Sequence, residues 1–182
     1  MIAILDYGSG NLRSAERAFA TSGHEVLVTS DARIAKEADG LVVPGVGAFA
    51  ACMKGLNAID GASIIKSRRE NERPTLGICI GMQILFAAGA EHSHTQPHPG
   101  VGVWPGTVTV LSSPLLPHMG WNSVEAPTDS LLFSGISNES FYFVHSYAAK
   151  TPVGGYTSAT QFHPEKSGDV GLALIKNWSK SL

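Results

Sequence analysis

The first half of the chain alternates short apolar runs with segments in which apolar residues recur at helical spacing. The apolar runs are rich in valine, isoleucine and leucine, as expected of buried strands. These strands are expected at 2–5, 24–29, 40–43 and 76–78. The helical segments between and after them are 12–21, 32–38, 48–56, 62–69 and 82–88. Strands that alternate with helices in this way predict an α/β fold, with a mostly parallel sheet flanked by helices on both faces.

The pattern changes after Glu91. Four strand-like runs follow one another without a helical segment between them, which predicts antiparallel strands added to the parallel sheet in the C-terminal half. These runs are 107–111, 122–125, 141–144 and 156–162. An amphipathic helix is expected over 170–178. We see no internal repeat, linker or low-complexity segment, and therefore expect one domain that spans residues 1–182.

Composition narrows the range of functions. The 182 residues are 43% hydrophobic and 15% charged, which suits a folded domain with a sizeable core. The net charge of -2 gives no reason to expect nucleic acid as a partner. No apolar run approaches the ~20 residues that span a bilayer, so we expect no membrane partner. Two cysteines make no disulfide framework, and a cytoplasmic location is the default.

Cys79 stands between two glycines in the run GICIG, directly after an apolar strand. A strand, a sharp turn and a helix in this order form a nucleophile elbow, whose strained backbone needs glycines. The turn would expose the sulfur at the carboxyl end of the sheet, where the helix N-terminus favours the thiolate. The Ile80 N–H would then face an oxyanion formed beside the sulfur. The alternative is a small apolar residue in a tight turn.

The segment QFHPE puts His163 and Glu165 just beyond a predicted strand. In an extended backbone, residues two apart project to the same side, so Glu165 can orient the His163 ring while its other nitrogen faces outward. Together with Cys79 they complete a nucleophile, a base and an orienting acid. An exposed loop histidine is the alternative for His163 taken alone, and the presence of Cys79 reverses that preference.

The run PGVG ends the third predicted strand and could present further backbone N–H groups to an oxyanion. Its residues are Gly45, Val46 and Gly47, with Pro44 before them. A plain glycine-rich connection between a strand and a helix is the alternative, and for this run alone it is the simpler one.

Taken together, these stretches resemble the class I, triad-type glutamine amidotransferases. The resemblance implies a flavodoxin-like fold. The motifs DYGSGN, PGVGAF, GICIGMQILF, PHMGWN, FYFVHSY and QFHPEKS occur in order along the whole chain. The set resembles the glutaminase subunit of imidazole glycerol phosphate synthase. The resemblance implies that Cys79 attacks the side-chain amide of glutamine, that His163 and Glu165 complete the triad, and that no cofactor or metal is needed.

The resemblance also implies a substrate pocket and a partner. Gln83, Ser146 and Tyr147 match positions expected to contact glutamine. The family passes ammonia to a cyclase subunit with a (β/α)8 barrel, as a heterodimer, in histidine biosynthesis. Residues that match its partner interface are Asn11, Met119, Trp121, Asn122 and Lys166. Packing of an antiparallel strand is the alternative for the three residues of PHMGWN, and an unpaired surface lysine is the alternative for Lys166.

Three features stand apart from the resemblance. The family has a longer segment between Tyr147 and Gln161, so either this chain has a deletion there or a mobile loop is missing from the sequence; we favour the missing loop, because both flanks match. His92, His94 and His98 invite a metal site, but their loop has no cysteine and only Glu91 as a nearby carboxylate. Cys52 lies in a helical run and is interpreted as a core thiol.

Two other functions fit part of the sequence. A triad glutaminase that feeds pyridoxal phosphate synthesis would share the catalytic residues, but the segments PHMGWN and YGSGN argue against it. A binding module that kept the fold without the chemistry would usually lose at least one of Cys79, His163 and Glu165, and all three are present.

Overall fold

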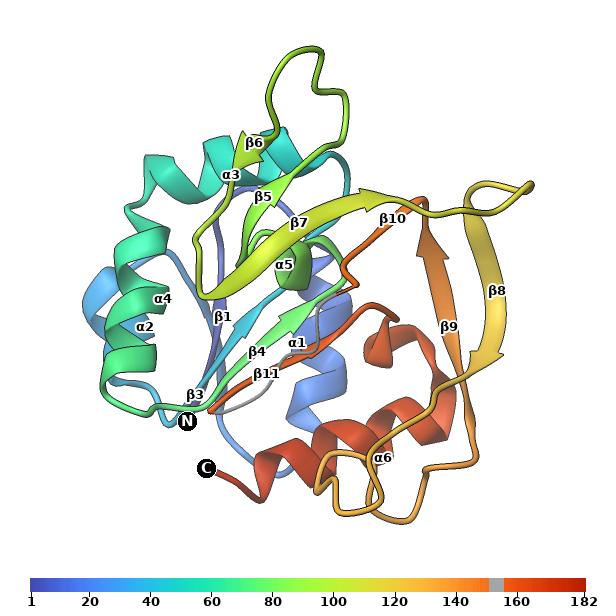
Figure 1. The fold of residues 1–182 in the computed structure, drawn as a ribbon. Helices are drawn as coiled ribbons and strands as arrows, with labels where there is room; N and C mark the ends of the chain where they lie inside the picture. The colour runs from blue at the N-terminus through green and yellow to red at the C-terminus, as the bar shows by residue number, and fades with distance from the viewer. Residues whose placement is uncertain (151–155) are drawn as a thin grey trace.

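The computed structural model describes residues 1–150 and 156–182 (Figure 1). Its centre is a five-stranded sheet in the order β11-β4-β3-β1-β2, in which every neighbouring pair is parallel. The strands are β1 (Ile2–Leu5), β2 (Val26–Thr29), β3 (Gly40–Val43), β4 (Thr75–Ile78) and β11 (Thr157–Thr160). Strands β1, β3 and β4 are buried along their whole length, as expected of inner strands of a parallel sheet covered on both faces.

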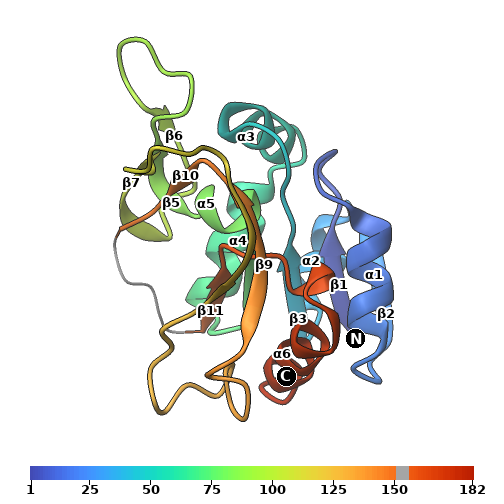
Figure 2. The same ribbon diagram turned by 90° about the vertical axis from the view of Figure 1, so that its right-hand side faces the viewer.

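Helices cover the sheet on both faces (Figures 1 and 2). Helices α1 and α6 pack against each other, and α2 and α4 form a second packed pair, as the alternating direction of the crossovers requires. The helices are α1 (Leu12–Ala20), α2 (Ala32–Glu37), α3 (Phe49–Ala58), α4 (Gly61–Glu70), α5 (Ile80–Gln83) and α6 (Gly168–Ser179). Asn11 and Asp31 cap α1 and α2, because their side chains accept from the backbone N–H of Ser14 and Ile34.

Arg68 of α4 is a buried residue whose hydrogen bonds link α4 to α2 and to β4. Its side chain is 1% exposed, and burial lowers the pKa of its guanidinium to about 10. The guanidinium donates to carbonyl oxygens around the end of α2 and to the Pro74 carbonyl, while Nε donates to Thr75 Oγ1 at 3.2 Å. The α2-side acceptors are the carbonyls of Ala35, Lys36, Ala38 and Asp39. A buried charge that is satisfied in this way fixes where α2, α4 and β4 meet.

Two smaller sheets extend the C-terminal half. The first has the order β10-β7-β5-β6, and the second is the antiparallel pair β8-β9, which projects beside α6 in Figure 1. The strands are β5 (Phe86–Gly89), β6 (His98–Pro99), β7 (Trp104–Val110), β8 (His118–Ser123), β9 (Ser140–His145) and β10 (Tyr147–Ala148). A 3-10 turn, η1 (Pro164–Lys166), precedes α6.

The α/β prediction is confirmed, with a mostly parallel central sheet, helices on both faces and antiparallel strands in the C-terminal half. One expected helix is wrong. Residues 82–88 were expected to be helical, but α5 ends at Gln83 and Phe86–Gly89 is a strand. The alanines favour a helix by propensity, but β5 pairs with β6 and β7 and buries Phe86, so tertiary packing overrides the local preference.

Two expectations for the C-terminal strands are also wrong. The run 156–162 was expected to be antiparallel, but β11 pairs in parallel with β4. The run 122–125 was placed too late, because the strand is His118–Ser123. Alternation of apolar and polar residues gives no direction for a strand, and direction is decided by the pairing partner. The parallel pairing of β11 matters most, because it brings the residues after β4 and β11 to the same sheet edge.

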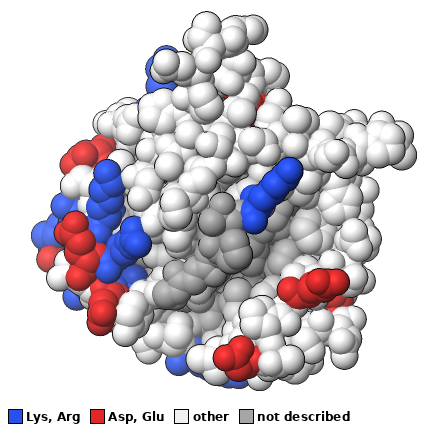
Figure 3. Space-filling view, viewed as in Figure 1, with Lys and Arg blue, Asp and Glu red and all other residues white. Residues whose placement is uncertain are grey.

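Charge is unevenly distributed over the face seen in Figure 3. Lysine, arginine and acidic side chains gather on the side that carries α2 and α4, while most of the remaining view is uncharged. Across the part of the chain that the structure describes, no helix is long and apolar enough to cross a membrane.

Candidate active site

Cys79 lies at the carboxyl end of β4, on the turn into the short helix α5. Its φ of 55° and ψ of -116° lie in a region that residues other than glycine rarely adopt. The turn packs closely on the neighbouring strand, since a Cβ added at Gly81 would lie 1.9 Å from the Val43 carbonyl oxygen. Only glycine fits there. The strained turn between a strand and a helix that the sequence predicted around Cys79 is therefore present.

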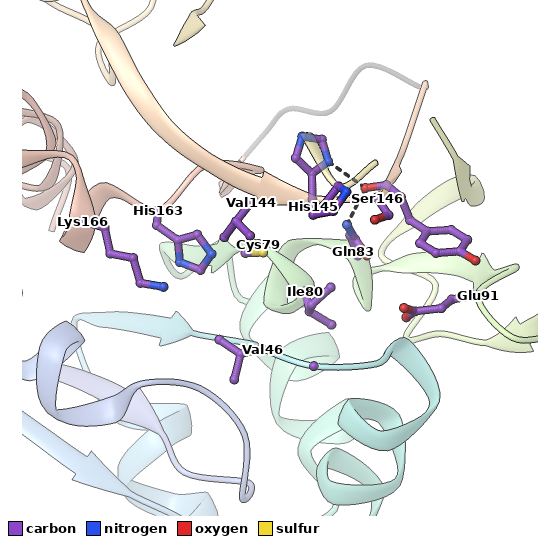
Figure 4. Close-up of a pocket in the computed structure, with 13 residues that line it drawn as sticks. Val46, Cys79, Ile80, Gln83, Glu91, Val144, His145, Ser146, His163 and Lys166 are labelled. Carbon is purple, nitrogen blue, oxygen red and sulfur yellow. Dashed lines mark hydrogen bonds between the residues drawn. The ribbon is translucent and has the colours of Figure 1, made fainter. Parts of the chain in front are cut away.

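His163 arrives at the same edge from β11. In the parallel pair, Thr160 lies opposite Ile78, so the chain leaves both strands side by side. Figure 4 shows the His163 ring next to Cys79. On the far side of the ring, Nδ1 lies 2.8 Å from Glu165 Oε1. This pair was expected from an extended backbone, but the segment is the 3-10 turn η1.

The turn that holds His163 is itself held by Ser167, which is 1% exposed. Ser167 Oγ donates to the His163 carbonyl at 2.7 Å and accepts from the Tyr142 N–H of β9 at 3.0 Å. The His163 N–H donates to the Tyr142 carbonyl at 3.0 Å. The backbone of His163 is thus held by β9 as well as by β11, which limits where its side chain can lie beside the cysteine.

The electrostatics of His163 suit a proton carrier. Burial lowers the pKa of its imidazole. Hydrogen bonds to Cys79 and Glu165, and the Coulombic interaction with each, outweigh burial and raise that pKa from 6.5 to about 9. A thiolate beside an imidazolium is the reactive form of a cysteine nucleophile. Burial raises the pKa of the other cysteine, Cys52, which favours its neutral thiol.

Gln83 and Gln161 link the nucleophile to the strand that carries Tyr147. Gln161 Nε2 lies 3.8 Å from Cys79 Sγ, and Gln161 Oε1 accepts from Gln83 Nε2 at 3.0 Å. Gln83 Nε2 also donates to the Tyr147 carbonyl at 2.8 Å. Gln83 Oε1 is buried and has no hydrogen-bond partner among the described residues. A buried acceptor without a partner is costly, which is typical of a group that a ligand satisfies.

A pocket of about 360 Å³ opens above Cys79 (Figure 4). It brings together most of the residues singled out from the sequence. These are Val46, Gly47, Cys79, Ile80, Gln83, Ser146, Tyr147, His163 and Lys166. Gly45 and Glu165 do not line it, because Gly45 packs under the elbow and Glu165 lies behind the imidazole. The remaining walls come from Glu91, Pro117, Val144 and His145.

The PGVG turn is packed against the elbow and tied to the loop after β1. A Cβ added at Gly45 would lie 2.3 Å from the Gly81 nitrogen, so the two backbones touch. On the other side, Ser9 Oγ accepts from the Val46 N–H at 3.2 Å and donates to the Val46 carbonyl at 2.9 Å. The Val46 N–H, one of the expected oxyanion donors, is therefore engaged by Ser9 and must be released before it can serve an oxyanion.

The residues expected at a partner interface lie outside the pocket, except for Lys166 at its mouth. Met119 and Trp121 of β8 are 62% and 59% exposed, which is unusual for large apolar side chains. Asn122 is exposed beside them on the same strand. Asn11 caps α1 through its side chain, which is a structural role that the sequence did not suggest.

Sequence reasoning missed four residues of the pocket, and two of them, Glu91 and His145, carry ionisable side chains. The Glu91 carboxylate lines the pocket and accepts from the Phe49 N–H at the start of α3, at 2.7 Å. It follows β5, the strand expected to be a helix, so its place at the sheet edge was not foreseen. His145 stands between the recognised residues of the FYFVHSY motif, and that position was the available signal.

His92, His94 and His98 do not form a metal site in the described part of the chain. No group of three or more histidine, cysteine, aspartate or glutamate side chains is arranged to hold an ion among residues 1–150 and 156–182. Cys52 is buried in α3, as expected of a core thiol, and its Sγ lies 3.1 Å from Ser9 Oγ. That contact adds Cys52 to the group of residues around the PGVG turn.

Comparison with known proteins identifies the family. The family model for class-I glutamine amidotransferases matches residues 3–157. The chain belongs to this family. Among solved structures, a glutamine amidotransferase superposes with a TM-score of 0.75 at 18% identity, covering 98% of each chain. A putative GMP synthase protein from Thermoplasma acidophilum gives 0.70 at 18% identity, covering 99% of this chain and 92% of its own. At this identity the structures show the fold alone.

Curated sequences are much closer. The HisH subunit of imidazole glycerol phosphate synthase from Mycolicibacterium paratuberculosis is 52% identical, with 100% of this chain and 98% of that protein aligned. The HisH subunits of Nocardia farcinica and Corynebacterium glutamicum are 51% and 50% identical. The chain covers 98% and 96% of these two proteins, which in turn align with 100% and 97% of the chain. Within the amidotransferases, the chain therefore belongs to the HisH group.

The alignment with the first relative is longer than this chain. The first alignment spans 203 positions and includes all 182 residues of this chain, so the relative carries residues that this chain lacks. Residues 151–155 of the short segment lie outside the described residues. Strands β10 and β11, on either side of residues 151–155, are described, and Cys79, His163 and Glu165 lie outside the segment.

Proposed function

We propose that this chain is the glutaminase subunit of an imidazole glycerol phosphate synthase, which hydrolyses glutamine and passes the ammonia to a cyclase subunit. The observation that carries the proposal is the meeting of Cys79 and His163 at one pocket, with Glu165 behind the imidazole, in a chain of the HisH group. The partner that we infer is a (β/α)8-barrel cyclase bound as a heterodimer, in the cytoplasm, where both free cysteines stay reduced.

The chemistry follows from the geometry of the triad. Cys79 Sγ attacks the amide carbon of the glutamine side chain, and the resulting oxyanion is stabilised by the Ile80 N–H and by an N–H of the PGVG turn. As the tetrahedral intermediate collapses, His163 gives its proton to the departing nitrogen, and ammonia and a thioester result. His163 then takes a proton from water, which attacks the thioester and releases glutamate. Glu165 keeps the ring oriented throughout.

The walls of the pocket suit the α-ammonium group of an amino acid. Glu91 presents a carboxylate, 15% exposed, that can attract the α-ammonium group. Gln83 Oε1, buried without a partner among the described residues, can accept one of the N–H groups of that ammonium. Ser146 and Tyr147 also line the pocket and contact the rest of the substrate. Lys166 at the mouth is placed to pair with a carboxylate of the partner.

We expect the isolated chain to be a poor glutaminase that its cyclase partner activates. The reason is the PGVG turn, where the Val46 N–H is engaged by Ser9 and is not free for an oxyanion. The test is to measure glutamate release by the purified chain, alone and mixed with candidate cyclase subunits, with and without the barrel ligand. Rapid hydrolysis by the chain alone would contradict activation by the partner.

The matched variant is Cys79→Ala. We expect the complex with this variant to lose glutamine-dependent synthesis and to retain synthesis from added ammonia, because only the ammonia supply depends on the thiol. Cys52→Ser, which keeps a hydrogen-bonding group beside Ser9 and Val46, is the control and should keep most of the glutaminase activity. Loss of synthesis with both nitrogen sources would show that Cys79 does more than supply ammonia.

A further inference from the structure

Two histidines that the mechanism above does not use form a hydrogen-bonded pair beside the pocket. His118 of β8 and His145 of β9 are direct partners across the antiparallel pair. Nδ1 of His118 lies 3.1 Å from Nε2 of His145. Phe143 packs on both rings, with centroid distances of 5.1 Å to His118 and 5.7 Å to His145. Both rings are therefore held in place by packing as well as by polar contacts.

The neighbours of the pair decide which nitrogen carries each proton. His145 Nδ1 lies 2.9 Å from the Tyr147 carbonyl oxygen, which can only accept, so Nδ1 must be the protonated nitrogen (Figure 4). A neutral His145 then offers Nε2 as an acceptor, and His118 must donate from Nδ1. This leaves His118 Nε2 as an acceptor, 3.4 Å from Asn122 Nδ2.

The orientation of the Asn122 amide agrees with this direction. Asn122 Oδ1 accepts from the Ser123 N–H at 2.9 Å, which turns Nδ2, the donor, toward His118. Burial lowers the pKa of His145, and the nearby His118 and His163 lower it further against the effect of the Tyr147 carbonyl. These donors and acceptors require a neutral His145, because a second proton on His145 would make both His145 Nε2 and His118 Nδ1 donors.

This series of hydrogen bonds continues into the candidate glutamine pocket. The Tyr147 carbonyl that accepts from His145 also accepts from Gln83 Nε2 at 2.8 Å. Gln83 Nε2 donates to Gln161 Oε1, and Gln161 Nε2 reaches Cys79 Sγ at 3.8 Å. A series of polar contacts therefore leads from Asn122, on the exposed strand β8, to the candidate nucleophile.

We propose that His118 and His145 are positioning residues of the glutaminase reaction, each a neutral imidazole with its proton on Nδ1. They hold the Tyr147 carbonyl and, through it, the Gln83 amide in the orientation that leaves Gln83 Oε1 free for the substrate. They also connect that orientation to Asn122 on β8. The inference rests on the proposed function, because it assigns these residues to the binding of glutamine.

The first test reads the tautomers directly and needs no substrate. Long-range 15N–1H NMR spectra of the 15N-labelled chain should show both His118 and His145 neutral near pH 7, with the proton on Nδ1. Assignment uses the spectra of His118→Asn and His145→Asn. A proton on Nε2 of His145 would overturn the proposal, because that nitrogen could then not accept from His118.

The second test compares two replacements of His118. His118→Leu removes the donor to His145, whereas His118→Asn keeps an N–H near the position of Nδ1. We expect the KM for glutamine of the complex to rise about tenfold in His118→Leu, as loss of one pocket hydrogen bond of about 1.4 kcal/mol implies, and to recover largely in His118→Asn. The kcat should fall less than the affinity. Ser123→Ala, on the same strand, is the control, because its side chain takes no part in the chain of contacts.

The outcomes separate this inference from the proposed function. If the wild-type complex hydrolyses no glutamine, the proposed function fails, while the tautomers are still decided by NMR. If the wild-type complex is active and His118→Leu keeps the wild-type KM, the positioning role is wrong. If His118→Leu and His118→Asn lose activity equally, with KM unchanged, the pair supports the fold of the hairpin and not the substrate, which also overturns the proposal.

Discussion

His163 is the residue whose surroundings decide the chemistry. Burial alone would keep its imidazole neutral, yet Cys79 and Glu165 raise its pKa to about 9. Because the folded pKa lies above the ordinary 6.5, the bound proton stabilises the fold fully below about pH 6.5. That stabilisation is lost as the pH rises through about 9. The same charge pairing that prepares the nucleophile therefore contributes to stability.

This gives a prediction at the scale of one residue. Removing the Cys79 side-chain sulfur in Cys79→Ala takes away a hydrogen bond and a Coulombic interaction that raise the pKa of His163, so that pKa should fall toward its ordinary value. NMR titration of the His163 ring protons in the wild type and the variant measures the change. Cys52→Ala should leave the pKa of His163 where it is. An unchanged pKa in Cys79→Ala would mean that Glu165 alone accounts for the shift.

Among the elements, the meeting of α2, α4 and β4 depends on a single side chain. Arg68→Met should destabilise the fold by about 3 kcal/mol or more, because several buried carbonyls lose their donor at once. Urea unfolding followed by circular dichroism measures this loss. Arg33→Met is the matched control on α2, since the Arg33 side chain is 74% exposed and its ion pair with Glu37 is a surface one. Equal stability of the two variants would contradict this account.

Elements with strong local signals could be predicted from the sequence. The strands at 2–5 and 40–43 could be predicted because strands buried on both faces are apolar throughout. The helix from Leu12 could be predicted because its apolar residues recur at helical spacing. Strand β5 was missed because its alanines carry helical propensity and its pairing with β7 is not local. The direction of β11 was missed for the same reason, since only the contact with β4 sets it.

The candidate site divides in a similar way. Cys79, His163 and Glu165 could be found because their chemistry and order are visible in short motifs. Glu91 and the pairing of His118 with His145 were not found, because they depend on contacts between segments far apart in the sequence, and only the FYFVHSY motif gave a signal for His145. The engagement of the Val46 N–H by Ser9 belongs to the same class, since the two residues are brought together by the fold alone.

At the scale of the whole molecule, the exposed face of β8 is the feature that indicates a protein–protein interface. Trp121 is 59% exposed and touches only Tyr142 among aromatic side chains of the described residues, with a centroid distance of 6.1 Å. Exposed tryptophans of this kind are frequent anchors of interfaces. We therefore propose that β8, at the far end of the contacts that lead to Cys79, carries the surface that binds the cyclase subunit.

Trp121→Ala should weaken binding of the cyclase subunit by about 30-fold or more, which corresponds to about 2 kcal/mol for an interface anchor. The fold should be retained, because the side chain is mostly outside the core. Titration calorimetry with the cyclase subunit measures the affinity, and circular dichroism checks the fold. Leu131→Ala, at a side chain that is 79% exposed but lies outside β8, is the control. Unchanged affinity in Trp121→Ala would move the interface elsewhere.

The parallel pairing of β4 with β11 has a consequence for the life of a new chain. The thiol at residue 79 is synthesised long before the imidazole at residue 163, and the two meet only when the last strand joins the sheet. Until then, Cys79 has no base beside it and the chain cannot consume glutamine. Chemical competence and completed folding are thus one event, so a truncated or half-folded copy in the cell would waste no substrate.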